Sequence, residues 1–312
     1  MSNIVKAGST AALPVQTTED IIKQYLASLD VKPRSKETYE KAVRYFLNWL
    51  TFKGINRPTR EDLLSYKQEL LNKYSSCTVS NYISGIKSFY RYLEAEQISP
   101  NIAAGVKGSK QTRGFHKDAL TVGQAKRVLE DASRATLEGL RDYAIVNLLL
   151  HTGLRTIEVA RANVEDIRSE AGEALLYIQG KGRDSKDAFV ILTEASLRPI
   201  KEYLKARGKA KEDAPLFASN SNRNRGGRLT TRMISKIAKD ALIKAGLNDS
   251  RLTAHSFRHT AITLSLLGGA TVQEAQALAR HSNINTTLIY AHNIDRISKA
   301  PERKIDSLLS GY

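Results

Sequence analysis

The sequence TAHSFRHTAITLSLLGGATVQEAQALARHSNINTTLIYAH, residues 253–292, holds the side chains around which the rest of this chain is organised. His255 and Arg258 are three residues apart, so they share one face if this segment is helical. His281 and Tyr290 follow within the same stretch. Arginine offers a phosphate a planar fork of donors, and histidine adds a donor that titrates. Because cations beside a tyrosine favour attack by its phenolate, we predict a phosphate site in which Tyr290 is the nucleophile.

The chain as a whole is strongly basic. Its 312 residues include 48 Lys and Arg against 32 Asp and Glu, which gives a formal net charge of +16. Residues 1–110 hold 16 basic and 10 acidic side chains, and residues 111–312 hold the other 32 and 22. The length is typical of about two domains. Positive charge on both halves predicts a polyanion held between them, and the alternative is an ordinary solvated surface.

Cysteine usage and hydropathy bear on the compartment. Cys77 is the single cysteine, which excludes an intramolecular disulfide and is typical of a reducing cytoplasm. We find no signal peptide and no apolar run as long as a membrane span. The prediction is a cytoplasmic protein with no membrane contact.

The first part of the chain is predicted to be helical. Residues 1–16 lack a clear period and are interpreted as a flexible arm. Residues 17–104 contain four segments with apolar side chains at helical spacing, and we expect their aromatic residues to lie in a core. A Thr at position 17 or 18 is expected to cap the first segment, and Pro33 with Ser35 to open the second. Residues 105–117, which are rich in Gly and basic residues, are predicted to be a linker.

The second domain, residues 118–312, is predicted to be mixed. Residues 174–179 and 187–192 favour a β-hairpin, and residues 164–167 favour a short strand. Helices are expected around these strands, and the last of them, residues 300–312, carries an apolar stripe of Ile305, Leu308 and Leu309. The expected fold is mainly α with a small β-hairpin or sheet (α+β), arranged as a two-domain clamp.

Short motifs along this second domain resemble those of one family. They are HTGLRTIEV around Arg155, QGKGRDSK around Lys181, HSFRH with His255 and Arg258, and ARHSNINTTLIYAH with His281 and Tyr290. Each motif alone is weak, but their order and spacing resemble the tyrosine recombinases, the phage integrase family. The resemblance covers about residues 17–312, and its first part is similar to the core-binding domain of that family.

The resemblance implies a reaction for the motif residues. Arg155 and Arg258 would clamp the scissile phosphate, and Tyr290 would attack it to form a 3′-phosphotyrosyl link and a free 5′-hydroxyl. Phosphoryl transfer of this kind needs in-line oxygens and a neutralised phosphate charge, which arginines supply without a metal. The family carries out strand exchange as a homotetramer on two DNA duplexes, so no metal or other cofactor is expected.

The remaining site residues are assigned by the same resemblance. Lys181 would protonate the leaving 5′-oxygen, although Lys186 and Arg183 compete for that role. His255 would be the acid–base partner of the tyrosine hydroxyl, and His281 would donate to the phosphate. Glu158 would orient Arg155 or a neighbouring group. Basic residues expected to contact DNA are Lys87, Arg91, Lys110, Arg113, Lys117, Arg183, Arg223, Arg225 and Arg228.

The partner implied by the resemblance is double-stranded DNA at a specific recombination site. The implied outcome is integration or excision of a mobile element, or resolution of DNA, with a need for accessory DNA-bending proteins left open. The protein would be a monomer or weak oligomer off DNA. The stripe on residues 300–312 would dock either on its own domain or on a neighbouring protomer, and the resemblance favours the neighbour.

Two departures and three alternatives stand beside this interpretation. Arg280 replaces the glycine that the family usually has before the histidine, and Ile157 replaces a frequent serine; neither change removes a catalytic group. His255, His259 and His281 would alternatively ligate zinc, although the helix glutamate of metalloproteases is missing. A type IB topoisomerase would relax DNA without exchanging partners. A non-enzymatic DNA-binding protein would need no reactive tyrosine.

Overall fold

A computed structural model describes residues 17–109, 118–180, 183–298 and 300–310 of the chain. The chain divides into two compact units, Met1–Arg113 and Gly114–Tyr312. The predicted arm at residues 1–16 lies outside the described residues. Each unit has its own hydrophobic core, so each is described by itself.

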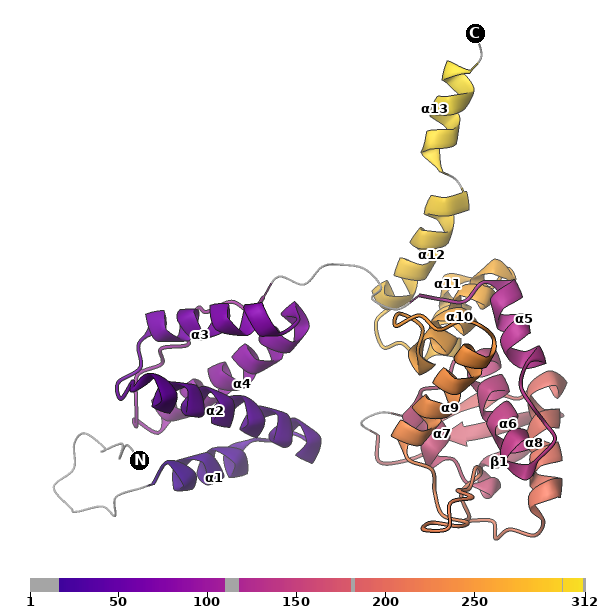
Figure 1. The fold of residues 1–312 in the computed structure, drawn as a ribbon, viewed down its shortest axis with the longest axis horizontal. Coiled ribbons are helices and arrows are strands. Elements are labelled where there is room, and N and C mark those ends of the chain that lie inside the picture. Colours follow the sequence, from indigo (N-terminus) through magenta and orange to yellow (C-terminus); the bar gives the residue numbers. More distant parts are fainter. Residues whose placement is uncertain (1–16, 110–117, 181–182, 299, 311–312) are drawn as a thin grey trace. The chain divides into compact units, whose positions relative to one another are not determined.

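The first unit is helical, as its apolar periodicity predicted (Figure 1). Its helices are α1 (Thr18–Ser28), α2 (Pro33–Lys53), α3 (Arg60–Lys73) and α4 (Ser76–Ala95). Thr17 caps α1 through a reciprocal bond with Asp20, and Thr59 caps α3 in the same way. These boxes satisfy backbone N–H groups that would otherwise lack partners at the helix start.

The start of α2 differs from the prediction. We expected Pro33 to break the chain and Ser35 to cap the helix, but α2 begins at Pro33 itself, and its N-cap residue Lys32 makes no side-chain cap bond. Proline fits the first helical position because its backbone nitrogen carries no hydrogen and its φ is already helical. The correction moves the N-cap from Ser35 to Lys32, three residues toward the N-terminus.

Aromatic side chains fill the core of the first unit, as predicted. Tyr25, Phe46, Tyr66, Phe89 and Tyr90 are all buried there. Helices α2 and α4 cross closely at a glycine, because a Cβ on Gly85 would lie 2.7 Å from the Cβ of Ala42. Any larger residue at that crossing would force the two helices apart.

The beginning of the predicted linker lies against this first unit. Val106 is buried with the α2–α4 core, and Ser80 of α4 accepts a hydrogen bond from the Ser109 backbone at 3.0 Å. Lys67 of α3 donates to the carbonyl oxygens of Lys107 (2.8 Å) and Gly108 (3.3 Å). Residues 110–117 of the predicted linker lie outside the described residues.

The second unit combines helices with a small antiparallel sheet. Its elements in chain order are α5 (Val122–Glu130), α6 (Leu137–Thr152), α7 (Thr156–Arg161), the 3₁₀ turn η1 (Val164–Asp166), β1 (Ile167–Glu170), β2 (Glu173–Ile178), β3 (Ala188–Ile191), α8 (Glu194–Arg207), α9 (Thr231–Lys244), α10 (Ala254–Leu267), α11 (Val272–Ala279), α12 (Asn285–Ser298) and α13 (Pro301–Leu309). The α+β class predicted from the sequence is confirmed.

Helix α6 forms the centre of this unit. Side chains on all of its faces are buried, because α8, α9 and α10 pack around it. A helix that is apolar all round is typical of such a central position. It ends at Gly153, whose φ of +60° is the left-handed conformation that glycine adopts most easily. This ending directs the chain at once into the residues that begin α7.

The sheet extends the predicted hairpin by one strand. β2 pairs with β3 (Leu176 opposite Val190), as expected, and β1 pairs with the other edge of β2 (Ile167 opposite Leu176). The strand predicted at residues 164–167 is wrong over most of its length, because Val164–Asp166 forms a 3₁₀ turn and β1 starts at Ile167. That turn is closed by the Asp166 carboxylate, which accepts from the Asn163 backbone at 2.7 Å.

The last helix leaves its apolar side chains exposed. No residue of α13 is buried, and Leu308 is 77% exposed. Within the residues that the structure covers, no helix is both long and apolar enough to cross a membrane.

Candidate active site

Helix α10 places the first pair of predicted site residues. Thr253 caps this helix, with its backbone donating to Ser256 Oγ at 3.1 Å, so His255 and Arg258 fall within its first turns. Arg258 is only 2% exposed, and its guanidinium donates to the carbonyl oxygens of Gly153 (2.6 Å) and Ala279. Arg258 therefore ties the end of α6 to the end of α11.

Burial and neighbouring cations change the acid–base behaviour of this pair. Desolvation, with the nearby charges of Arg155 and Arg280, lowers the pKa of Arg258 to about 10. The pKa of His255 is also lowered, first by desolvation and then by Arg258 and Arg155. The ring of His255 is nevertheless exposed, so it remains within reach of an incoming group.

Arg155 stands at the N-cap of α7, directly after the turn at Gly153. Its Nη1 donates to Glu158 Oε1 at 2.9 Å, and its backbone nitrogen donates to Glu158 Oε2 at 2.8 Å. The side chain of Arg155 is 30% exposed, whereas that of Glu158 is completely buried. The i, i+3 pair predicted from the sequence is present, and Glu158 holds Arg155 at the surface of the unit.

The same glutamate also binds Arg280. Arg280 Nη2 lies 3.0 Å from Glu158 Oε2, and Arg280 Nη1 donates to the Leu278 carbonyl at 2.7 Å. Arg280 ends α11 in the left-handed conformation, with a φ of +53°. That conformation costs a non-glycine residue roughly 1–3 kcal/mol, so it persists only where other contacts enforce it. It is also the conformation that a glycine at this position would adopt most easily.

His281 follows on the same turn. Its Nδ1 is 2.9 Å from the hydroxyl of Thr287, which is fully buried. Desolvation and the charges of Arg258, Arg155 and Arg280 lower the pKa of His281 to about 4. The imidazole is therefore neutral at pH 7, and an anion among these arginines would favour its protonated form.

Tyr290 lies on α12 and points into the unit. It is 5% exposed, and its hydroxyl hydrogen-bonds to Nδ1 of His259. Burial raises the pKa of Tyr290 to about 12, against the opposing effect of Arg258. Its ring also stacks at 6.4 Å from that of His281. The structure thus brings the tyrosine beside the cationic residues but holds its hydroxyl on His259.

His259 is the residue whose role the sequence did not reveal. It was considered there only as a zinc ligand, and no local spacing pointed to its contact with Tyr290, which is 31 residues away. Desolvation lowers its pKa to about 4, assisted by His255, Arg258 and His281. Over the described ranges, no three His, Cys, Asp or Glu side chains are grouped as metal ligands would be.

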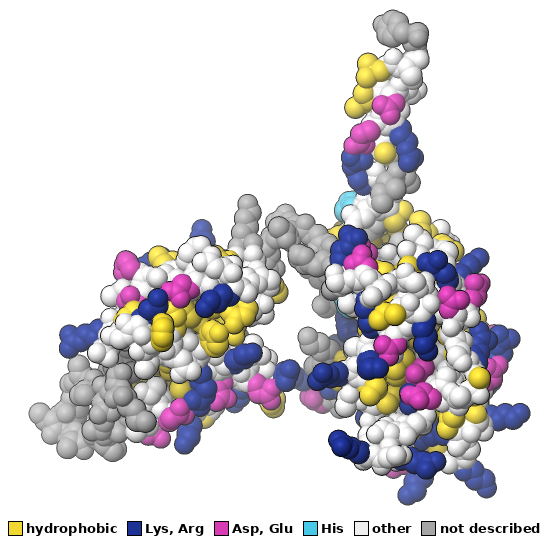
Figure 2. Space-filling view, viewed as in Figure 1, with side chains coloured by type: hydrophobic (Ala, Val, Ile, Leu, Met, Phe, Trp, Pro, Cys, Tyr) yellow, Lys and Arg dark blue, Asp and Glu magenta, His cyan; other side chains and the backbone are white. Residues whose placement is uncertain are grey.

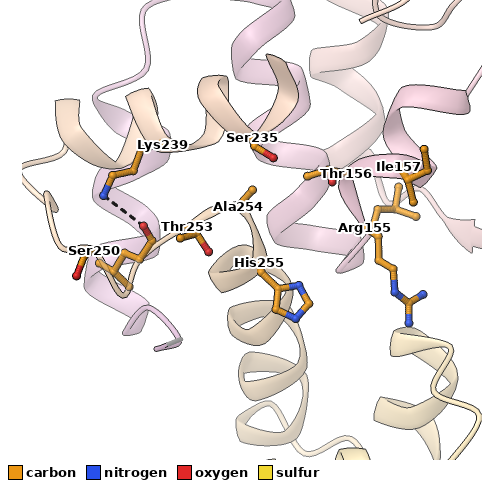
Figure 3. Close-up of a pocket in the computed structure, with 11 residues that line it drawn as sticks. Arg155, Thr156, Ile157, Ser235, Lys239, Ser250, Thr253, Ala254 and His255 are labelled. Carbon is orange, nitrogen blue, oxygen red and sulfur yellow. Dashed lines mark hydrogen bonds between the residues drawn. The ribbon is translucent and has the colours of Figure 1, made fainter. Parts of the chain in front are cut away.

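A pocket of about 640 Å³ opens beside two of the site residues. Its walls include Arg155, Ser235 of α9 and His255. Figure 3 shows the side chains of Arg155 and His255 extending on the same side of this pocket. Lys239, on its far wall, donates to the carbonyl oxygens of Asp249 (2.7 Å) and Leu252 (3.3 Å). An anion in this pocket would lie beside Arg155 and His255.

The predicted general acid, Lys181, lies outside the described residues. Of its two competitors, Lys186 contacts both oxygens of Asp166, at 2.7 and 2.6 Å. Asp166 is buried and closes the turn before β1, so Lys186 joins the connection between β2 and β3 to that turn. Arg183 is exposed and pairs with Asp187 at 3.2 Å.

Apart from Arg183, the predicted DNA contacts fall into four groups. Lys110, Arg113 and Lys117 lie outside the described residues, and Arg223 and Arg225 are exposed on the loop before α9. Lys87 and Arg91 are on α4, where Arg91 Nε donates to the Lys87 carbonyl at 3.4 Å. The guanidinium of Arg228 donates to Ala160 (2.8 Å), Ala162 (3.1 Å) and Asn163 (2.6 Å), which joins its loop to α7. None of these contacts involves DNA, so the DNA-binding roles stay predictions.

Models of known protein families match both units of the chain. The Phage integrase family matches residues 118–296, which is more than half of the chain and contains every described site residue. The chain belongs to the phage integrase family. The N-terminal SAM-like domain of phage integrases matches residues 15–99, in agreement with the helical first unit.

Relatives and solved structures of the phage integrase family agree with this assignment. The chain is 30% identical over 283 residues to tyrosine recombinase XerC of Pelobacter propionicus, covering 88% of this chain and 90% of that protein. Its fold is similar to the XerH site-specific recombinase bound to a palindromic difH substrate (TM-score 0.73, 20% identity, 92% and 85% coverage). It is also similar to a lambda integrase tetramer bound to a Holliday junction (TM-score 0.66, 17% identity, 88% and 77% coverage).

Proposed function

We propose that this protein is a site-specific DNA recombinase that cuts and rejoins strands through a covalent bond between Tyr290 and a DNA 3′-phosphate. Membership of the phage integrase family and the likeness to a tyrosine recombinase along most of the chain support the activity. The observation that carries the residue assignment is the position of Tyr290, buried beside an arginine cluster built from α7, α10 and the turn after α11.

The bonds made and broken in this reaction fit the residues of the site. The oxygen of Tyr290 forms a bond to phosphorus while the bond from phosphorus to the 5′-oxygen breaks. Arg155, Arg258 and His281 donate to the non-bridging oxygens, whose charge they neutralise. His255 takes the phenolic proton, and Lys181 gives a proton to the leaving 5′-oxygen. Reversal by another 5′-hydroxyl rejoins the strand without a nucleotide cofactor.

The resting position of Tyr290 implies a step before attack. Its hydroxyl bonds to His259 and its pKa is raised to about 12 by burial, so at neutral pH the group is protonated. Attack requires the hydroxyl to leave His259 and to approach a phosphate held by the arginines. A bound phosphate offsets the positive charge of Arg155, Arg258 and Arg280. It thereby favours the conformation in which Tyr290 lies close to these arginines.

The partner is double-stranded DNA at a specific site, bound by a homotetramer on two duplexes. Figure 2 shows Lys and Arg side chains on the visible surface of both units, as expected for phosphate contacts. The lambda integrase structure shows such a tetramer on a junction for a protein of the same fold. The exposed Ile305, Leu308 and Leu309 on α13 support a contact with a neighbouring protomer, because a short helix gains little stability by itself.

The test of this function is covalent capture. Duplexes that bind the protein are first selected from a random-sequence pool. Each duplex is then nicked close to the expected cleavage position and incubated with the protein. The short fragment released by cleavage is lost from such a duplex, so the covalent intermediate accumulates. We expect a protein–DNA band on a denaturing gel, its absence with Tyr290→Phe, and nearly unchanged binding of that variant in a gel shift. Tyr177→Phe, which changes an exposed hydroxyl on β2 that bonds to Glu170, is the matched control. A band that persists in Tyr290→Phe would assign the nucleophile elsewhere.

A further inference from the structure

Arg280 is placed in a way that needs an explanation. The non-glycine residues with positive φ in the described structure are Gln97, Ala171 and Arg280. Gln97 and Ala171 are exposed on turns, where solvent tolerates any side chain. The side chain of Arg280 is instead only 15% exposed, and its Nε is buried without a hydrogen-bond partner in the structure. A cation kept in an unfavourable backbone conformation with an unsatisfied donor points to a role beyond packing.

The geometry of Glu158 shows what this role is. A carboxylate can bind one arginine through both oxygens, in parallel bonds that use two nitrogens of the guanidinium. Here Oε2 of Glu158 accepts from Arg280 Nη2 at 3.0 Å and from the Arg155 backbone at 2.8 Å. The Arg155 side chain reaches only Oε1, through Nη1 at 2.9 Å. Arg280 thus occupies the oxygen that a bidentate Arg155 pair would use.

We propose that Arg280 is a positioning residue for Arg155: by occupying one oxygen of Glu158, it limits Arg155 to a single side-chain bond and leaves its other N–H groups for the scissile phosphate. Without Arg280, the lone pair of Glu158 Oε2 that Arg280 now uses would be open to a second nitrogen of the Arg155 guanidinium, and a bidentate pair would draw two of those nitrogens away from the pocket. The inference rests on the proposed role of Arg155 as a phosphate clamp.

A test substitution at Arg280 must remove the side chain while it keeps the backbone conformation of the turn. The carbonyl of Ala279, one residue earlier, accepts from Arg258, and His281 follows one residue later. A change of backbone conformation at Arg280 would therefore disturb two other site residues. Glycine and asparagine both adopt positive φ readily, so they remove the guanidinium and keep the turn.

The experiment compares Arg280→Gly and Arg280→Asn with the full-length wild type in single-turnover cleavage of the nicked duplex. We expect cleavage to slow by roughly 10–100-fold, the usual range for loss of a residue that orients a catalytic ligand, with DNA binding and the melting temperature nearly unchanged. If one variant fails to fold, the other carries the test. The Arg155→Ala variant and the Arg155→Ala, Arg280→Gly double variant complete a cycle, in which the Arg280 change should add little once Arg155 is gone.

A second substrate separates positioning from a general structural role. In a duplex with a methylphosphonate at the scissile position, one charged oxygen is replaced by a methyl group, so cleavage depends less on the arginine clamp. The ratio of wild-type to Arg280→Gly rates should fall toward one on this substrate. An equal loss on both substrates, or wild-type cleavage of the normal duplex by both variants, would overturn the proposal. Tyr290→Phe distinguishes this outcome, because cleavage by that variant would refute the proposed function instead.

Discussion

Replacing His259 by asparagine should make the second unit less sensitive to acid. Desolvation and the facing groups His255, Arg258 and His281 lower the pKa of His259 from 6.5 to about 4. As the pH falls below 6.5, the unfolded chain therefore binds a proton that the folded chain does not. The stability contributed by neutral His259 is complete above pH 6.5 and is lost between pH 6.5 and about 4.

The size of this loss follows from the two pKa values. Each tenfold difference in proton affinity between the folded and unfolded states is worth about 1.4 kcal/mol. At pH 5 the unfolded histidine is mostly protonated and the folded one mostly neutral, which lowers the free energy of unfolding by on the order of 2 kcal/mol relative to pH 7. Asparagine does not titrate and still offers Tyr290 an acceptor, so His259→Asn should lack this part of the acid sensitivity.

The assay is urea unfolding of the full chain at pH 7, 6 and 5, followed by circular dichroism and by tryptophan fluorescence. Trp49 is the single tryptophan and lies in the first unit, so its signal serves as an internal control that the substitution should not move. His292→Asn, which replaces an exposed histidine on α12, is the matched variant and should keep the wild-type profile. Equal losses of stability between pH 7 and pH 5 in wild type and His259→Asn would refute the reasoning.

Three further predictions concern DNA. The affinity of the full chain for its duplex should fall steeply between 50 and 200 mM salt, by about 10³-fold or more if at least six phosphates are contacted; fluorescence anisotropy would measure it, and a flat response would contradict phosphate binding by both units. Cleavage should survive excess chelator, because arginines supply the charge that a metal would otherwise provide; loss of cleavage that a divalent ion restores would argue against this. Deleting residues 300–312 should spare binding to one site but weaken assembly on two-site DNA, as followed by gel shift and cross-linking, and unchanged synapsis would remove the tail from assembly.

The features that could be predicted from the sequence are those with local causes. The helix cap expected at position 17 or 18 is confirmed at Thr17, because a cap of this kind depends on two residues three apart. The hairpin of β2 and β3 is also confirmed, because its two strands are neighbours in the sequence. The 3₁₀ turn at Val164–Asp166 was missed although its closing bond, from the Asn163 backbone to the Asp166 carboxylate, also joins residues three apart, because residues 164–167 were interpreted as a strand.

The same distinction between local and tertiary causes applies to the candidate site. The spacing of His255 and Arg258 placed both on the first turns of α10, as the structure has them. The bond between Tyr290 and His259 joins residues 31 apart, and that between Arg280 and Glu158 joins residues 122 apart. Helical periodicity carries no information on such contacts, because they arise from the packing of α7, α10, α11 and α12. Motif order marked which residues matter, and tertiary packing decided which of them meet.

The unequal charges around Glu158 also affect how stability should be understood for this protein. Three guanidinium groups, those of Arg155, Arg258 and Arg280, share the field of one buried carboxylate, and repulsion among these cations contributes to the lowered pKa values of Arg258 and Arg280. One carboxylate thus faces three cations at the place where we propose that a DNA phosphate binds, which leaves an excess of positive charge in the folded chain. A ligand that binds only the folded state adds its binding free energy to folding. The second unit would thus be more stable when bound to its substrate than alone. The scissile phosphate would then stabilise the fold as well as serve as the reacting group.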